Sequence, residues 1–117
     1  MSAERPGVRA QVLLWTAQRA SAAVLAICVV VHLVTIIYAV RSGLSAAEIL
    51  GRTRDSLAWG AFYTVFVLAI VVHAPIGLRS ILSETFGWRG RGLDVAVMAV
   101  ALTLAMWGLR AMYAVFA

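Results

Sequence analysis

The chain has 117 residues, of which 63% are hydrophobic, and its formal net charge at pH 7 is +5. A water-soluble domain of this length could not bury so much apolar surface, so the composition excludes a soluble domain and indicates a protein embedded in a lipid bilayer. The ten basic residues are all arginines, and they are not gathered into a patch with interleaved aromatic residues. This distribution argues against nucleic acid as a partner and is typical of membrane anchoring.

Three apolar segments are each long enough to cross a bilayer, which takes about 20 helical residues. They are residues 17–40, 57–81 and 93–116. We therefore predict an all-α integral membrane protein with three transmembrane helices, in which residues 1–117 form a single transmembrane domain. The first apolar segment exceeds the roughly 7–15 apolar residues of a signal-peptide core, so we expect it to be retained as a helix.

Two local patterns add detail between and within these segments. The sequence from Ser45 to Glu48 is a capping box, which predicts a short surface helix over residues 46–51. In the third segment, Ala101, Ala105 and Gly108 recur at helical spacing. Small side chains on one face allow two transmembrane helices to approach closely.

The arginines near the helix ends predict the orientation of the chain, because they are more frequent on the cytoplasmic side of a membrane. The N-terminal side and the second connection together carry Arg5, Arg9, Arg19, Arg79, Arg89 and Arg91. The first connection and the C-terminal end together carry Arg41, Arg52, Arg54 and Arg110. We expect a multi-pass protein of the bacterial inner (cytoplasmic) membrane with its N-terminus in the cytoplasm.

The second predicted helix carries a histidine, which needs a partner when it lies in hydrocarbon. Gly77 follows His73 by one helical turn on the same face, and Arg79 lies about 9 Å further along the axis than His73. These residues describe a slot for a haem: His73 as the axial ligand of the iron, Gly77 against the flat ring and Arg79 on the carboxylates of the ring. The alternative is a structural histidine bonded to a neighbouring helix.

The first predicted helix carries a second histidine, His32. In antiparallel neighbouring helices, His32 and His73 would differ in depth by about 10 Å, so we do not expect them to bind the same iron. His32 is either the axial ligand of a second haem or a structural histidine. Any iron bound by either histidine would take its other axial ligand from another chain.

Two stretches of the chain resemble motifs of a known family. The sequence His73-Ala-Pro-Ile-Gly77-Leu-Arg79, followed by Glu84 and the turn Phe86-Gly87-Trp88, resembles the second-helix signature of the cytochrome b membrane-anchor subunit of succinate dehydrogenase/fumarate reductase (complex II). The sequence Gln18-Arg19-Ala20-Ser21-Ala22 resembles the family's His-Arg-x-Ser-Gly element, with Gln18 in place of His and Ala22 in place of Gly. The resemblance covers roughly residues 15–90.

This resemblance implies that the chain is half of a heterodimeric helical anchor that binds one or two b haems. It implies that His73 shares a haem with a histidine of a second membrane-anchor subunit, and that His32 serves a second haem as in two-haem members. It also implies a quinone site at Arg19, whose further residues would be Trp15, Thr16 and Ser21. Trp15 stands where the family commonly has a serine, so Thr16 or Ser21 would supply the hydroxyl.

The predicted function is therefore that of a haem b-binding anchor of succinate:quinone oxidoreductase, which helps to form the quinone site. An iron–sulfur subunit and a flavoprotein subunit are the implied partners outside the bilayer, and they carry the succinate chemistry. We expect no catalytic residue in this chain, because its sequence has no nucleophile–base pair and no Cys-x-x-Cys motif. The alternatives are a small three-helix transporter or assembly subunit with structural histidines, or another b-type quinol-oxidising cytochrome.

Overall fold

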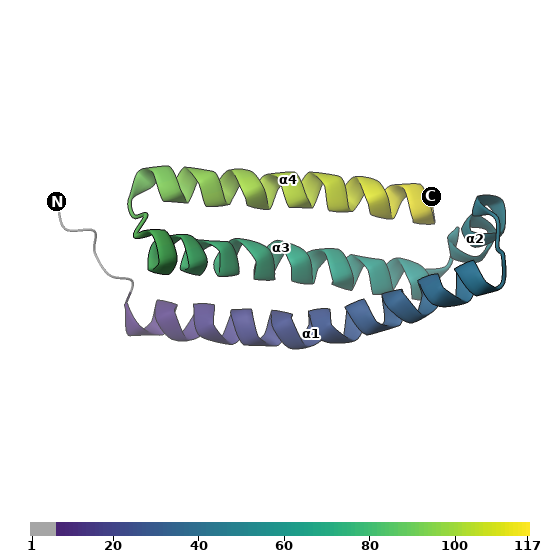
Figure 1. The fold of residues 1–117 in the computed structure, drawn as a ribbon, viewed down its shortest axis with the longest axis horizontal. Coiled ribbons are helices and arrows are strands. Elements are labelled where there is room, and N and C mark those ends of the chain that lie inside the picture. The colour runs from purple at the N-terminus through teal and green to yellow at the C-terminus, as the bar shows by residue number, and fades with distance from the viewer. Residues whose placement is uncertain (1–6) are drawn as a thin grey trace.

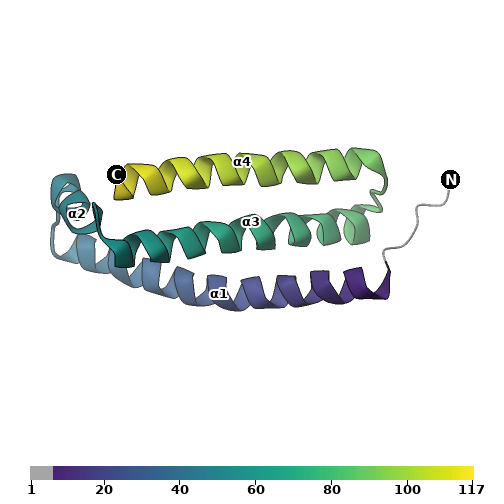
Figure 2. The same ribbon diagram turned by 180° about the vertical axis from the view of Figure 1, so that it is seen from behind.

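The computed structural model describes residues 7–117, which form four helices (Figure 1). They are α1 (Val8–Arg41), α2 (Ala46–Thr53), α3 (Leu57–Phe86) and α4 (Arg91–Phe116). The three long helices lie side by side, with α3 between α1 and α4, as the views from front and back agree (Figures 1 and 2). The short helix α2 lies at the end of the bundle where α1 leads into α3 (Figure 1).

Helices α1, α3 and α4 have 34, 30 and 26 residues, and each is long and apolar enough to cross a membrane. The predicted all-α fold with three transmembrane helices is confirmed. Helix α1 begins at Val8 instead of residue 17, and α3 continues to Phe86 instead of residue 81. An apolar run measures the thickness of the hydrocarbon layer, whereas a helix can continue through polar residues beyond it.

The predicted short helix is present as α2 and extends two residues past the predicted end at residue 51. The Ser45 hydroxyl caps it by accepting the backbone N–H of Glu48 at 3.2 Å. At the other end of α2, the Thr53 hydroxyl donates to the carbonyl of Val115 at 2.9 Å, and the N–H of Asp55 donates to the carbonyl of Phe116 at 3.1 Å. These bonds tie α2 to the C-terminal end of α4.

Small residues bring α3 and α4 together. A Cβ atom placed on Gly108 would lie 2.7 Å from Cγ1 of Val67, and one placed on Gly60 would lie 2.8 Å from the ring of Phe116. Both distances are shorter than van der Waals contact, so a side chain at either position would force the neighbouring side chain to shift. The predicted close packing at Gly108 is therefore observed.

Most large apolar side chains of the three long helices face outwards. Ile27 is 66% exposed and Leu102 is 64% exposed, and few residues of the described chain are buried. Apolar side chains can face lipid tails, or the apolar surface of another membrane protein, without a hydrophobic penalty. The three helices therefore form an open layer that can accept partners along its sides.

Substitution of Gly108 by leucine should destabilise the pairing of α3 with α4. The new side chain would overlap Val67, and overpacking of this kind costs about 1–3 kcal/mol. The measurement is thermal unfolding of the purified protein in detergent, with Ala114→Leu on an exposed position of α4 as the matched control. Equal stability of the two variants would contradict the close contact at Gly108.

Candidate functional site

His73 lies on α3, half-buried and next to α1. Its Nδ1 atom is 3.4 Å from the hydroxyl oxygen of Ser21, a residue of α1 that is only 7% exposed. The same hydroxyl donates to the backbone carbonyl of Gln18 at 3.0 Å. The cross-helix contact places His73 at the same depth in the bundle as Ser21.

One turn along α3 from His73, Gly77 makes room for a side chain of α1. A Cβ atom placed on Gly77 would lie 3.0 Å from Nε2 of Gln18. The Oε1 atom of Gln18 is buried and has no hydrogen-bond partner within residues 7–117. Gly77 thus has a packing role within this chain, and its predicted contact with a haem ring stays a prediction.

A cavity of about 430 Å³ opens between α1 and α3 towards the N-terminal end of α1. Its walls are formed by Leu14, Trp15, Gln18, Arg19, Ile76, Arg79 and Ser80. The guanidinium of Arg19 lies 4.7 Å from the centre of the Trp15 ring, a cation–π contact that holds it against the aromatic surface. The cavity combines an aromatic wall with two cationic groups, one from each helix.

The second of these cations, Arg79, forms an ion pair with Asp94 of α4. The two side chains are 48% and 56% exposed, and such a solvent-accessible pair contributes at most about 1 kcal/mol. Arg79 therefore already holds a carboxylate, and it could exchange Asp94 for another carboxylate at low cost. The partner of Arg79 within the described chain is Asp94, and its predicted pairing with a haem propionate stays a prediction.

The predicted quinone residues do not all lie together. Trp15 and Arg19 line the cavity between α1 and α3, whereas Thr16 is exposed and does not line it. Ser21 also lies outside the lining and contacts His73 instead. Helical spacing accounts for this division, because residues 15, 18 and 19 share a face that excludes residue 16.

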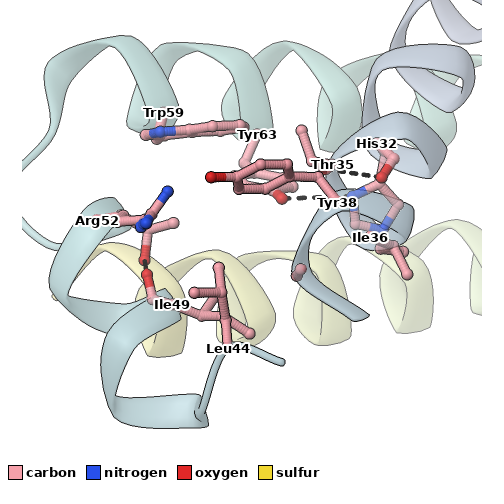
Figure 3. A pocket seen from close by; sticks show the side chains of 11 residues that line it. His32, Thr35, Ile36, Tyr38, Leu44, Ile49, Arg52, Trp59 and Tyr63 are labelled. Carbon is pink, nitrogen blue, oxygen red and sulfur yellow. Dashed lines mark hydrogen bonds between the residues drawn. The ribbon is translucent and has the colours of Figure 1, made fainter. Parts of the chain in front are cut away.

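His32 occupies a separate site, which residues of α2 also line. Figure 3 shows His32 among the side chains of this site. The Nδ1 atom of His32 is 3.3 Å from the hydroxyl of Tyr63 on α3. The ring of His32 makes T-shaped contacts with two aromatic rings of α3. Its centre lies 5.8 Å from that of Tyr63 and 5.5 Å from that of Phe66. The plane of Trp59 stacks on that of Tyr63, with 24° between the ring planes.

These aromatic side chains form part of a cavity of about 460 Å³ between α1, α2 and α3. Figure 3 shows Arg52 of α2 pointing into this space beside Tyr38 of α1. The Arg52 guanidinium lies 5.7 Å from the centre of the Tyr38 ring. This second cavity therefore has a histidine on one side and a cation on the other.

The contacts of the two histidines give their relative depth. His73 is level with Ser21, which lies eleven residues before His32 on α1, and eleven residues of helix span about 16 Å. His32 is level with Tyr63, which lies ten residues before His73 on α3, or about 15 Å. The separation is larger than the sequence alone suggested, and the two imidazoles are too far apart to ligate one iron.

A sequence profile described as "succinate dehydrogenase/fumarate reductase transmembrane subunit" matches residues 4–110 of the chain. The chain belongs to this family. Searches of curated proteins and of solved structures found no match to it. As a succinate dehydrogenase/fumarate reductase transmembrane subunit, the chain is a multi-pass membrane anchor, and membership implies association with the other subunits of that complex.

The donor set of this transmembrane subunit fits a haem. A haem iron has four nitrogen ligands from its macrocycle, so a protein needs to supply only one or two axial ligands. His73 supplies an imidazole whose Nδ1 already has a protein partner, which leaves Nε2 as the second ring nitrogen. Arg79, further along the same helix, can pair with a carboxylate.

Sequence reasoning missed two contacts at these sites. Tyr63 is the polar partner of His32, and the side chain of Gln18 packs on Gly77. Both are contacts between helices. Their only signal in the sequence is that each residue shares a helix face with a residue already singled out, such as Gln18 with Trp15.

Proposed function

We propose that this chain is the haem b-binding membrane-anchor subunit of a succinate:quinone oxidoreductase, and that it helps to form the quinone site. The observation that carries the proposal is the position of His73. It lies within a membrane-spanning helix, half-buried, one turn from the cavity residue Ile76 and with Ser21 on its Nδ1 side. A half-buried imidazole one helical turn from an aromatic and cationic cavity suits a haem near a quinone.

The residues of this chain act by position and charge. Nε2 of His73 would bind the iron of haem b, and a histidine of the second anchor subunit would be the other protein ligand. Arg79, which pairs with Asp94 in the isolated chain, would pair with a propionate of the bound haem. The bound haem supplies one-electron storage between the iron–sulfur subunit and quinone, while the protein sets its place and surroundings.

Arg19 serves the quinone. Its guanidinium rests on Trp15 at the cavity wall, so it is already oriented before quinone enters. A quinone oxygen gains negative charge when it accepts an electron, and a preorganised cation beside that oxygen stabilises the charge. Trp15 offers a flat apolar surface to the quinone ring.

The arginine distribution supports an N-terminus on the cytoplasmic side of a bacterial inner membrane. The cavity of Arg19 lies towards the N-terminal end of α1, so quinone meets the iron–sulfur subunit on that side. Fumarate reduction is the same reaction in reverse, and the same anchor serves either direction.

We further propose that His32 binds a second haem. It lies about 15 Å in depth from His73, beside a cavity that also contains Arg52. The competing role is a structural one, in which the imidazole only bonds Tyr63. The two roles differ in the number of haems per complex.

Replacement of His73 by alanine should remove the haem that it ligates, because no other histidine of the described chain lies at that depth. The measurement is the haem b absorbance of the purified complex, expressed per covalently or tightly bound flavin. Val72→Ala on the same helix is the matched control and should leave the ratio unchanged. A full haem complement in the His73 variant would overturn the ligand assignment.

Replacement of Arg19 by alanine should lower quinone reductase activity about 100-fold, the effect of losing one preorganised charge-stabilising group. Haem content should stay at the wild-type level, because Arg19 lies in the cavity and not beside His73. Arg9→Ala, on the same helix but outside the cavity, is the control. An unchanged rate with a quinone substrate would place the quinone elsewhere.

Replacement of His32 by alanine should halve the haem-to-flavin ratio if the complex carries two haems, one on each histidine. A pyridine haemochrome assay measures this ratio directly. Tyr63→Phe, which removes only the hydroxyl bonded to His32, serves as the comparison and should keep both haems. A ratio that is unchanged in the His32 variant assigns this histidine to a structural role.

A further inference from the structure

Ser21 is a buried hydroxyl between α1 and α3 that contacts His73 and does not line the quinone cavity. We propose that Ser21 is a positioning residue for His73: its oxygen accepts the Nδ1–H of the imidazole and so fixes the tautomer that leaves Nε2 free to bind a metal. This inference rests on the proposed haem-binding function of His73. It gives Ser21 a role different from that of a quinone ligand.

The direction of the hydrogen bond follows from counting protons. A serine hydroxyl has one hydrogen to donate and two lone pairs with which to accept. The Ser21 oxygen lies 3.0 Å from the carbonyl oxygen of Gln18, which can only accept, and 3.4 Å from Nδ1 of His73. The serine donates its proton in the shorter contact, to the Gln18 carbonyl. In the hydrogen bond with His73 the donor must therefore be the N–H at Nδ1.

A neutral imidazole carries one proton on its two ring nitrogens. With that proton on Nδ1, Nε2 keeps its lone pair in the ring plane and can donate it to a metal. The hydrogen bond also fixes the rotation of the ring about its side-chain bonds. Metal-binding histidines commonly have such a partner on the other nitrogen, and its loss typically weakens metal binding by about 10–100-fold.

The location of Ser21 makes this hydroxyl hard to replace. It is 7% exposed and lies between two membrane-spanning helices, where water is not available as a substitute acceptor. The hydrogen bond of His32 is less constrained. Its partner is the hydroxyl of Tyr63, which has no second acceptor within residues 7–117, so that hydroxyl can either donate or accept.

The test uses the intact complex with Ser21→Ala, which removes the hydroxyl, and Ser21→Thr, which keeps it. Three quantities are measured: the haem-to-flavin ratio, the midpoint potential of the haem and the g values of its low-spin ferric EPR signal. Thr103→Ala is the matched control, because the Thr103 hydroxyl bonds a carbonyl of its own helix but no histidine.

In Ser21→Ala we expect haem binding at least about tenfold weaker and a raised midpoint potential. An imidazole that no longer donates its Nδ1–H is a poorer electron donor to ferric iron. Ser21→Thr should return both quantities towards the wild-type values, and Thr103→Ala should leave them unchanged.

Two results would overturn the positioning role: Ser21→Ala with unaltered haem content, potential and g values, or Ser21→Ala and Ser21→Thr with equal shifts. The second result would mean that the effect follows side-chain volume and not the hydroxyl. The failure of the proposed function itself is distinct, because it appears as a full haem complement in His73→Ala.

Discussion

Two polar contacts between α1 and α3 set the register of these helices. Ser21 lies against His73, and His32 lies against Tyr63, with 3.4 and 3.3 Å between the polar atoms. A shift of the helices by one residue would move each pair apart by about 1.5 Å. Because hydrocarbon offers no replacement partner for a polar group, both pairs resist such a shift together.

The N-terminal cavity depends on this register. Its walls come from α1 and α3 alone, and Arg19 faces Ile76 and Arg79 only when the two helices are aligned as they are. Gln18 and Gly77 add a steric constraint at the same level, since a larger residue at position 77 would meet the Gln18 amide. Polar pairing and close packing thus act at one place to shape one site.

The third long helix is held by a different kind of contact. Helix α4 approaches α3 closely at Gly60 and Gly108. The C-terminal end of α4 is also bound to α2 by the hydrogen bond of Thr53. Within a bilayer there is little hydrophobic driving force between helices, so association depends on such close packing and hydrogen bonds. The outer faces remain apolar and exposed, which suits a subunit of a larger membrane complex.

Much of the protein could be predicted from its sequence by itself. Apolar runs of bilayer length determined the three membrane helices, and the Ser45 capping box determined α2, because both features are local. The pattern around His73 and Arg79 was enough to indicate the family. Residues of one helix that act at the same site must share a face of that helix, so their spacing in the sequence is characteristic.

The pairing of residues from different helices was decided only by the tertiary structure. Ser21 meets His73 instead of the cavity, Arg79 pairs with Asp94, and the histidines lie further apart than estimated. The estimate measured each histidine from the middle of an apolar segment, and α1 and α3 both extend beyond those segments. Helical periodicity determines which side of a helix a residue occupies, whereas the sliding and rotation of one helix against another depend on side-chain contacts that have no signature in either helix alone.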